Sequence, residues 1–433
     1  MTPLRGLSKV EPLDLQNPVD HWQHFQTGDF GQKWNSSKLI VREGKDAIAP
    51  LLHILNDPEA DAETHWFTIR ALGNFPDPEV IAAIAAQIGD NPHYINRTAE
   101  QTAELSAFAI ETLAAMGTLA IDVLSQLLQI PERRLLAAKA LNQVRSSGVI
   151  PAMVSVASDE NAMVRYYAVD ALGSFHNTAV TSVLLAALKD PAANVRKAAV
   201  MALGRRGDLQ AEYQLSQQLQ PLLWDIDVTV SCQAALALGR LGSDDTLEVL
   251  QQILLSEHTP MALRFDTVRA LEWYCDALLE SPSQYVRGDG AADATALDIL
   301  SEALVKFASG LGEAVNGHGL SAQENAQIQV AIIRVLGELC HGPMAQRATE
   351  VLIQRLQNQP DAMVAQAIIM ALANLGQPQA FDALLPLLRH PADAVPIHAV
   401  AALKRLDPDH SLTRVTTYIE GCPEHTTDVI DFW

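Results

Sequence analysis

Apolar residues recur along most of this chain with the period of an α-helix. The clearest example is residues 164–172, where apolar side chains at positions i, i+4, i+7 and i+8 would form one stripe on a helix. The same pattern returns in residues 195–203, and both copies end in Ala-Leu-Gly, at Gly173 and Gly204. The shift between these two glycines, 204 − 173 = 31 residues, predicts an internal helical repeat.

Polar residues and a proline indicate where the helices of this repeat begin and end. Asp159 and Asp190 each precede an apolar stripe and are suited to cap a helix N-terminus, with Pro191 in the first turn. Gly173 and Gly204 directly follow the last apolar residue of each stripe. We therefore expect both glycines to end their helices in the left-handed conformation.

A second apolar run, at residues 179–188, follows the first helix and ends where the next repeat begins. Two helices in about 31 residues are typical of HEAT-like repeats, because one helix pair buries its apolar faces only against neighbouring pairs. The sequence therefore predicts an all-α fold, a HEAT-like solenoid in which helix pairs form a right-handed α-α superhelix.

The repeat predicts three segments along the chain. Residues 37–406 form the solenoid, with an irregular insertion at about 276–325 whose six glycines predict mobile loops at 281–295 and 309–325. Within the array, residues 207–224 read as one longer second helix. Residues 407–433 are predicted to form a C-terminal helix and tail.

Residues 1–36 do not follow the repeat and contain a cluster of aromatic residues: Trp22, Phe25, Phe30 and Trp34. Solenoids need a cap over the apolar face of their first repeat, and we expect this segment to supply it. The alternative is an aromatic docking surface for a partner or a pigment.

Composition excludes some classes of partner. The chain has 30 basic and 51 acidic residues, a net charge of −21, which argues against binding nucleic acid or an anionic membrane surface. The first ten residues lack the pattern of a signal peptide, and no apolar run reaches the length of a membrane span. We therefore expect a soluble, cytoplasmic protein.

No sequence motif indicates an enzyme. The chain lacks HExxH, GxSxG, CxxC and a Gly-rich phosphate loop, so we expect no catalytic residue, no intrinsic metal and no cofactor of its own. Cys232, Cys275 and Cys340 lie in apolar helices and are expected to be inert core residues. Cys422 is in a polar tail three residues before His425, where it is either an ordinary surface thiol or an external ligand to a metal centre on a partner.

Aromatic and basic residues of the repeat are candidates for partner binding. In the adjacent pairs Trp66-Phe67 and Tyr166-Tyr167, we expect one ring to face the core and the other to be available to a ligand. Arg165 and Arg196 lie six residues after Asp159 and Asp190. They are interpreted either as ion pairs that hold the turn between repeats or as a basic ladder that binds anions.

The last two residues, Phe432 and Trp433, place an aromatic pair beside the terminal carboxylate. This pair is either folded back onto the last repeat or a short docking peptide.

The Asp-Pro, Val-Arg and Ala-Leu-Gly pattern resembles the HEAT-like repeats of phycobilisome-lyase type, which are abundant in cyanobacteria. This resemblance covers most of residues 38–406. Among proteins with such repeats, the whole-chain pattern is similar to that of a cyanobacterial HEAT-repeat protein that binds an A-type, IscA-like iron–sulfur carrier. Residues 65–73 and 219–232 carry this likeness. The resemblance implies a protein that docks the carrier and stabilises its cluster, such as a shared [2Fe–2S] cluster held by the partner.

Two functions therefore stand at this point. One is a non-catalytic scaffold that binds the carrier protein. The other is a phycobilin lyase or bilin chaperone, whose partners would be a phycobiliprotein and a tetrapyrrole with two propionates. That ligand would require basic residues such as Arg165, Arg196 and Arg264 in an aromatic groove, whereas the net charge of −21 disfavours it.

Overall fold

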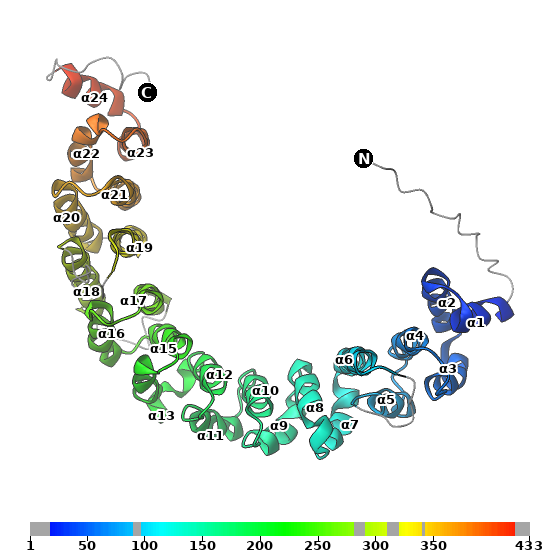
Figure 1. The fold of residues 1–433 in the computed structure, drawn as a ribbon. Coiled ribbons are helices and arrows are strands. Elements are labelled where there is room, and N and C mark those ends of the chain that lie inside the picture. Colours follow the sequence, from blue (N-terminus) through cyan, green and yellow to red (C-terminus); the bar gives the residue numbers. More distant parts are fainter. Residues whose placement is uncertain (1–17, 90–96, 281–290, 310–319, 340–342, 421–433) are drawn as a thin grey trace. The chain divides into compact units, whose positions relative to one another are not determined.

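A computed structural model of this protein describes residues 18–89, 97–280, 291–309, 320–339 and 343–420. The described residues form α-helices joined by short turns and 3-10 segments. They fall into two compact units: unit 1, Met1–Ala187, and unit 2, Leu188–Trp433. The all-α architecture of stacked helix pairs predicted from the sequence is confirmed in both units (Figure 1).

In unit 1, one layer of helices contains α2, α4, α6, α8 and α10, each packed against the next. In the second layer α3, α5 and α7 pack in the same order, and α9 packs against α11. The helices of unit 1 are α1 (Pro18–Thr27), α2 (Phe30–Arg42), α3 (Ile48–Leu55), α4 (Ala62–Leu72), α5 (Pro78–Ala85), α6 (Ala99–Ala115), α7 (Ile121–Leu127), α8 (Pro131–Gln143), α9 (Ile150–Val156), α10 (Ala162–Leu172) and α11 (Thr178–Ala187).

Unit 2 has the same two layers. Helices α12, α15, α17, α19, α21 and α23 pack in order in the first, and α16, α18, α20 and α22 in the second. Its helices are α12 (Ala193–Leu203), α13 (Gln210–Tyr213), α14 (Leu215–Leu219), α15 (Val228–Leu241), α16 (Leu247–Leu255), α17 (Met261–Glu280), α18 (Ala291–Ala308), α19 (Ala322–Leu339), α20 (Pro343–Gln357), α21 (Ala362–Leu375), α22 (Gln379–Leu384), α23 (Ala394–Leu406) and α24 (Ser411–Glu420).

The helix starts lie beyond the predicted caps. Asn161, not Asp159, caps α10 by accepting a hydrogen bond from the backbone N–H of Met163. Helix α12 begins at Ala193, so Pro191 precedes the helix instead of lying in its first turn. The carboxylates of Asp159 and Asp190 instead accept from the backbone N–H two residues later, at 2.8 Å in both cases. Both aspartates therefore shape the turn before the helix.

The prediction of left-handed glycine caps was wrong. Gly173 and Gly204 have φ of −61° and −64°, which is right-handed helical backbone. Gly204 instead packs closely against α15, the next helix of its layer. A methyl group at this position would lie only 2.4 Å from the Cβ of Ala237.

The same close contact recurs further along unit 2. A methyl group at Gly239 of α15 would lie 2.3 Å from the carbonyl oxygen of Ala270 on α17. One at Gly337 of α19 would lie 2.6 Å from the Cβ of Ala371 on α21. The repeated glycine is therefore needed for the approach of successive first helices, since real Cβ atoms do not come this close.

Residues 207–224 do not form the single longer helix predicted from the apolar pattern. They are divided into the 3-10 segment Gly207–Leu209, α13, α14 and the 3-10 segment Gln220–Trp224. Gln214 adopts a left-handed conformation with φ 49°. The side chain of Gln210 stabilises this break by hydrogen bonding both the backbone N–H and the hydroxyl of Ser216.

Helices also occupy positions where the sequence predicted a segment boundary or an irregular insertion. Helix α2 runs across the expected start of the solenoid at residue 37. Helix α18 fills residues 291–308 of the predicted irregular insertion and packs against α16 and α20, so the insertion is shorter than expected. Of the two predicted loops, residues 281–290 and 310–319 lie outside the described residues, and α19 already begins at Ala322.

The glycine contact predicts an unusually costly substitution. We expect Gly239→Ala to destabilise the protein by about 3 kcal/mol, because the added methyl group meets backbone atoms of Ala270 that move only with α17. Urea unfolding followed by circular dichroism measures the change. Gly207→Ala is the matched control: nothing lies within 4 Å of its added methyl group, and its cost should stay within about 0.5 kcal/mol. Equal effects of the two substitutions would contradict the role of the contact.

Candidate functional site

Trp66 belongs to an aromatic cluster that joins α2, α4 and α6. Its indole stacks on Phe108 with ring centroids 4.6 Å apart and packs edge-on against Phe67 at 5.0 Å. Phe67 is fully buried and Trp66 is half-buried, so this pair has the one core ring that the sequence predicted. Phe30 and Trp34 of α2 also contact Phe67 edge-on.

Arg70 lies between the tryptophans of this cluster. Its guanidinium carbon is 3.6 Å from the ring centroid of Trp34 and 5.9 Å from that of Trp66. The Nη1 atom is buried without a hydrogen-bond partner. The aromatic faces therefore hold the guanidinium in place while part of its hydrogen-bonding capacity stays unused.

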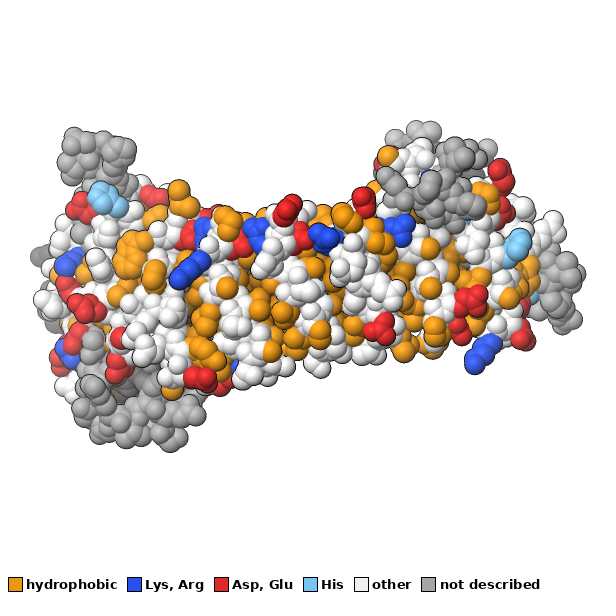
Figure 2. All heavy atoms as spheres, turned by 90° about the horizontal axis from the view of Figure 1, so that it is seen from below, with side chains coloured by type: hydrophobic (Ala, Val, Ile, Leu, Met, Phe, Trp, Pro, Cys, Tyr) orange, Lys and Arg blue, Asp and Glu red, His pale blue; other side chains and the backbone are white. Residues whose placement is uncertain are grey.

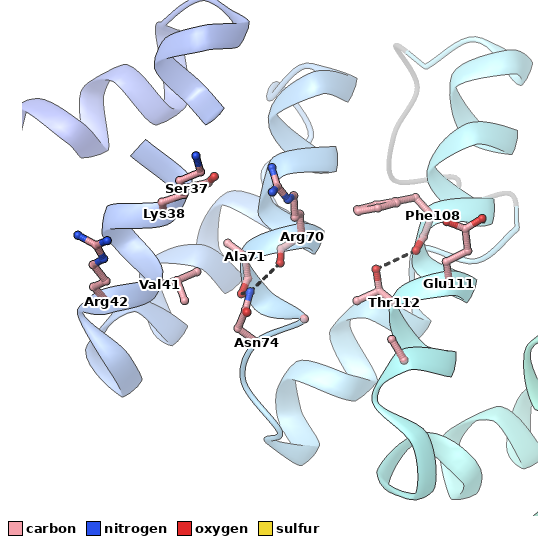
Figure 3. Close-up of a pocket in the computed structure, with 12 residues that line it drawn as sticks. Ser37, Lys38, Val41, Arg42, Arg70, Ala71, Asn74, Phe108, Glu111 and Thr112 are labelled. Atoms are coloured by element: carbon pink, nitrogen blue, oxygen red, sulfur yellow. Dashed lines mark hydrogen bonds between the residues drawn. The ribbon is translucent and has the colours of Figure 1, made fainter. Parts of the chain in front are cut away.

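A pocket of about 610 Å³ opens beside Arg70, between α2, α4 and α6 (Figure 3). Three cations line it, Lys38 and Arg42 from α2 and Arg70 from α4, whereas Glu111 of α6 is its only acidic residue. Within the described part of the chain, none of these three cations forms an ion pair. The pocket is therefore a local basic site in an acidic protein.

A second candidate surface is the loop between the 3-10 segment Gln220–Trp224 and α15. Apolar and acidic residues alternate here, and the apolar ones point outward. Trp224 is 57% exposed, Ile226 is 98% exposed and Val228 is 37% exposed. Exposed large apolar residues at one place are typical of interaction surfaces, so we call residues 224–228 the apolar loop.

Ion pairing and capping fix the apolar loop in place. Asp225 accepts two hydrogen bonds from Arg196 of α12, both 2.7 Å, and its carboxylate is almost fully buried. The Arg196 hydrogen bonds hold the pKa of Asp225 below its usual value, and those from Asp225 raise the pKa of Arg196. Asp227 caps α15 through the N–H of Thr229. The exposed side chains of the apolar loop are thus attached to a backbone that these hydrogen bonds hold in place.

The two predicted arginines hold the turns between helices. Nη1 of Arg165 donates to the carbonyls of Asp159 and Glu160, and Nη1 of Arg196 donates to those of Asp190 and Pro191. Figure 2 shows Lys and Arg side chains beside Asp and Glu side chains on the face it displays, and not gathered in a basic patch. These contacts favour the turn-holding interpretation, and a contact of Arg165 or Arg196 with a partner stays a prediction.

Arg134, one period before Arg165, makes the same kind of contact. Its Nε donates to the carbonyl of Leu128, six residues earlier, and its Nη1 pairs with Asp159 at 2.8 Å. Arg134 thus links one repeat to the next, as Arg196 does through Asp225.

Tyr166 and Tyr167 do not divide into one core and one surface ring. Both are half-buried, and their ring centroids lie 5.3 Å apart. Burial and the nearby Asp170 carboxylate raise the pKa of Tyr166. The expectation of one inward ring was wrong for this pair, because both rings are only partly buried.

The remaining candidates are thiols and the C-terminal aromatics. Cys422, Phe432 and Trp433 lie outside the described residues, as does Cys340. Burial, together with the adjacent Asp266 carboxylate, raises the pKa of Cys232 to about 12, so this thiol is unreactive near neutral pH. Among the residues that the structure describes, no group of three His, Cys, Asp or Glu side chains could hold a metal ion.

Sequence reasoning missed the cations of the pocket and the apolar loop. Lys38, Arg42 and Arg70 come from two helices, and no spacing pattern announces them. Arg70 directly precedes Ala71-Leu72-Gly73. In the two clearest repeats the residue at this position, Asp170 or Met201, is exposed, so the repeat alignment could have indicated that Arg70 lies at the surface of α4. Trp224 was counted as the end of the predicted helix at residues 207–224, and Ile226 was not singled out.

The stacked helix pairs and open surfaces define the class of α-helical solenoids, which commonly bind protein partners. A family model for HEAT repeats matches residues 121–204, 150–222, 181–272, 317–404 and 349–423. Together these matches cover more than half of the chain, which therefore belongs to the HEAT-repeat family. A search of curated proteins gives no match.

Solved structures share the fold at low sequence identity. A crystal structure of importin beta is 14% identical with a TM-score of 0.50, covering 96% of this chain and 66% of that one. An engineered protein is 19% identical with a TM-score of 0.44, covering 82% and 98%. Human deoxyhypusine hydroxylase in complex with glycerol is 20% identical with a TM-score of 0.26, covering 67% and 96%. These likenesses concern the fold alone.

No helix in the described part of the chain has the length and apolar character needed to cross a membrane.

His65, next to Trp66, predicts a pH dependence. Burial, then the charge of Arg97, lowers the pKa of His65 from 6.5 to about 4, while its Nδ1–H donates to the carbonyl of Asp61. The unfolded chain thus binds a proton that the folded chain does not. The free energy of unfolding therefore keeps its full value above pH 6.5 and decreases as pH falls toward 4, by about 3 kcal/mol in total.

Urea titrations between pH 7 and pH 4 measure this loss. We expect His65→Asn to flatten the decline of the unfolding free energy, and the matched variant of the exposed His53, His53→Asn, to leave it unchanged. A decline of equal slope in both variants would show that His65 is not its source.

Proposed function

We propose that this protein is a non-catalytic interaction scaffold that binds an A-type iron–sulfur carrier and stabilises the carrier's cluster. The HEAT-repeat fold supports the scaffold, because stacked helix pairs offer extended surfaces to protein partners. The choice of the carrier rests on the resemblance carried by residues 65–73 and 219–232. The protein acts in the cytoplasm, catalyses no reaction and has no cofactor of its own.

The observation that favours this partner is the apolar loop. It lies inside residues 219–232, one of the two stretches that carry the resemblance, and it exposes Trp224 and Ile226. Aromatic side chains at the centre of an interface supply much of its binding free energy. Since Arg196 and Asp225 already fix the loop, little conformational entropy is lost when a partner binds it.

The cluster in this proposal belongs to the carrier. A [2Fe–2S] cluster at the edge of a small carrier is open to solvent and chelators, and an apolar surface placed over it would slow its loss. Cys422 is the thiol of this chain proposed as an external ligand to that cluster. Trp66, Tyr166, Tyr167, Phe432 and Trp433 are proposed as further contacts.

The test uses a purified A-type carrier loaded with a [2Fe–2S] cluster under anaerobic conditions. We expect the two proteins to elute together from a gel-filtration column, and the visible absorbance of the cluster to persist longer in the presence of a chelator. Trp224→Ala combined with Ile226→Ser should weaken binding about tenfold or more, because both side chains lose their apolar contact area.

The matched control is Leu119→Ser in unit 1, which removes a similarly exposed apolar side chain (52%) outside the apolar loop and should leave binding unchanged. Separate elution of the wild-type protein and the carrier would overturn the proposal. A shifted visible band on mixing with a bilin, without carrier binding, would favour the lyase or bilin chaperone instead.

A further inference from the structure

We infer that the pocket between α2, α4 and α6 is a separate binding site, which takes the carboxylate side chains of an acidic protein segment. This inference concerns unit 1 alone and does not depend on which protein binds the apolar loop of unit 2.

The charges of the pocket identify the ligand's chemistry. Lys38, Arg42 and Arg70 line it without an ion pair to any described residue, and Glu111 balances only part of their charge. In a chain of net charge −21, uncompensated cations around one cavity are unusual. Like charges held together repel one another, so bound carboxylates would relieve this repulsion as well as form new hydrogen bonds.

The guanidinium of Arg70 is already held in place by an aromatic ring. Its guanidinium lies 3.6 Å from the ring centroid of Trp34, and Lys38 approaches the same ring at 5.3 Å. The buried Nη1 of Arg70 has no hydrogen-bond partner, which is costly for a charged group. Figure 3 shows the Arg70 side chain extending from α4 between the α2 and α6 sides of the pocket. Arg70 therefore adds to the pocket a positive charge that its aromatic neighbours already hold in place.

The extent of the pocket favours a peptide segment over a small carboxylate. Its walls come from three successive helices of one layer, and packed helices lie about 8–10 Å apart. Lys38 and Arg42 are neighbours on one face of α2, whereas Arg70 comes from α4. An extended segment rises about 3.3 Å per residue and can therefore contact both helices. Phe108 and Val41 add apolar wall. The fitting segment therefore has carboxylates toward α2 and α4 and an apolar residue toward Phe108.

Fluorescence anisotropy with labelled model peptides tests this site. A peptide of alternating glutamate and leucine should bind the full-length protein and weaken as salt is added, and its glutamine–leucine counterpart should not bind. Lys38→Glu combined with Arg42→Glu should lower the affinity about tenfold or more, because two attractive charges become repulsive. Both side chains are exposed, so the variant should keep the wild-type circular dichroism spectrum.

Lys45→Glu is the matched control, since Lys45 is exposed but does not line the pocket; it should bind the glutamate peptide like the wild type. Glu111→Gln should strengthen binding by removing the only acidic residue of the pocket. Equal binding of the glutamate and glutamine peptides, or unchanged binding by the Lys38/Arg42 variant, would overturn the inference. Displacement of the peptide by equimolar citrate or biliverdin would also overturn it, because a small carboxylate would then suffice.

Discussion

The close contact between successive first helices is the constraint on which this structure depends. In unit 2, Gly204, Gly239 and Gly337 each leave room for the next helix of the layer at a distance that excludes a methyl group. Without this approach the apolar stripes of neighbouring pairs would not meet, and their burial is the main source of stability in a repeat protein. Each of these glycines faces an alanine of the next helix, Ala237, Ala270 or Ala371, so both sides of the contact are small.

The period and the helices were predictable because both are local properties of the sequence. The sequence pattern marks the positions of Asp159, Asp190 and the repeated glycines, but it did not predict their roles. An aspartate before a helix caps it or shapes the preceding turn with the same carboxylate chemistry. A glycine after an apolar stripe either ends the helix or admits a neighbour. The choice depends on the adjacent repeat, which a single stripe does not contain. Gln214 shows the same limit, since it breaks a run that has no glycine at that point.

The candidate surfaces are found where the chain departs from its repeat. Arg134, Arg165 and Arg196 recur every 31 residues, and their guanidinium groups are used to hold turns. Lys38, Arg42 and Trp224 have no counterpart of this kind, and they line the pocket or stand exposed on a pinned loop. Residues that serve every repeat therefore maintain the stack, whereas residues specific to one repeat are free to bind. Trp66 combines both roles, because its ring packs on Phe108 while its repeat borders the pocket.

The scaffold account is tested most directly by hydrogen exchange of the full chain with and without the cluster-loaded A-type carrier. The account predicts slower amide exchange in residues 224–228 when the carrier is present, and unchanged exchange in the turn that contains Leu119. Exchange in residues 224–228 that is the same with and without a saturating amount of carrier would contradict it.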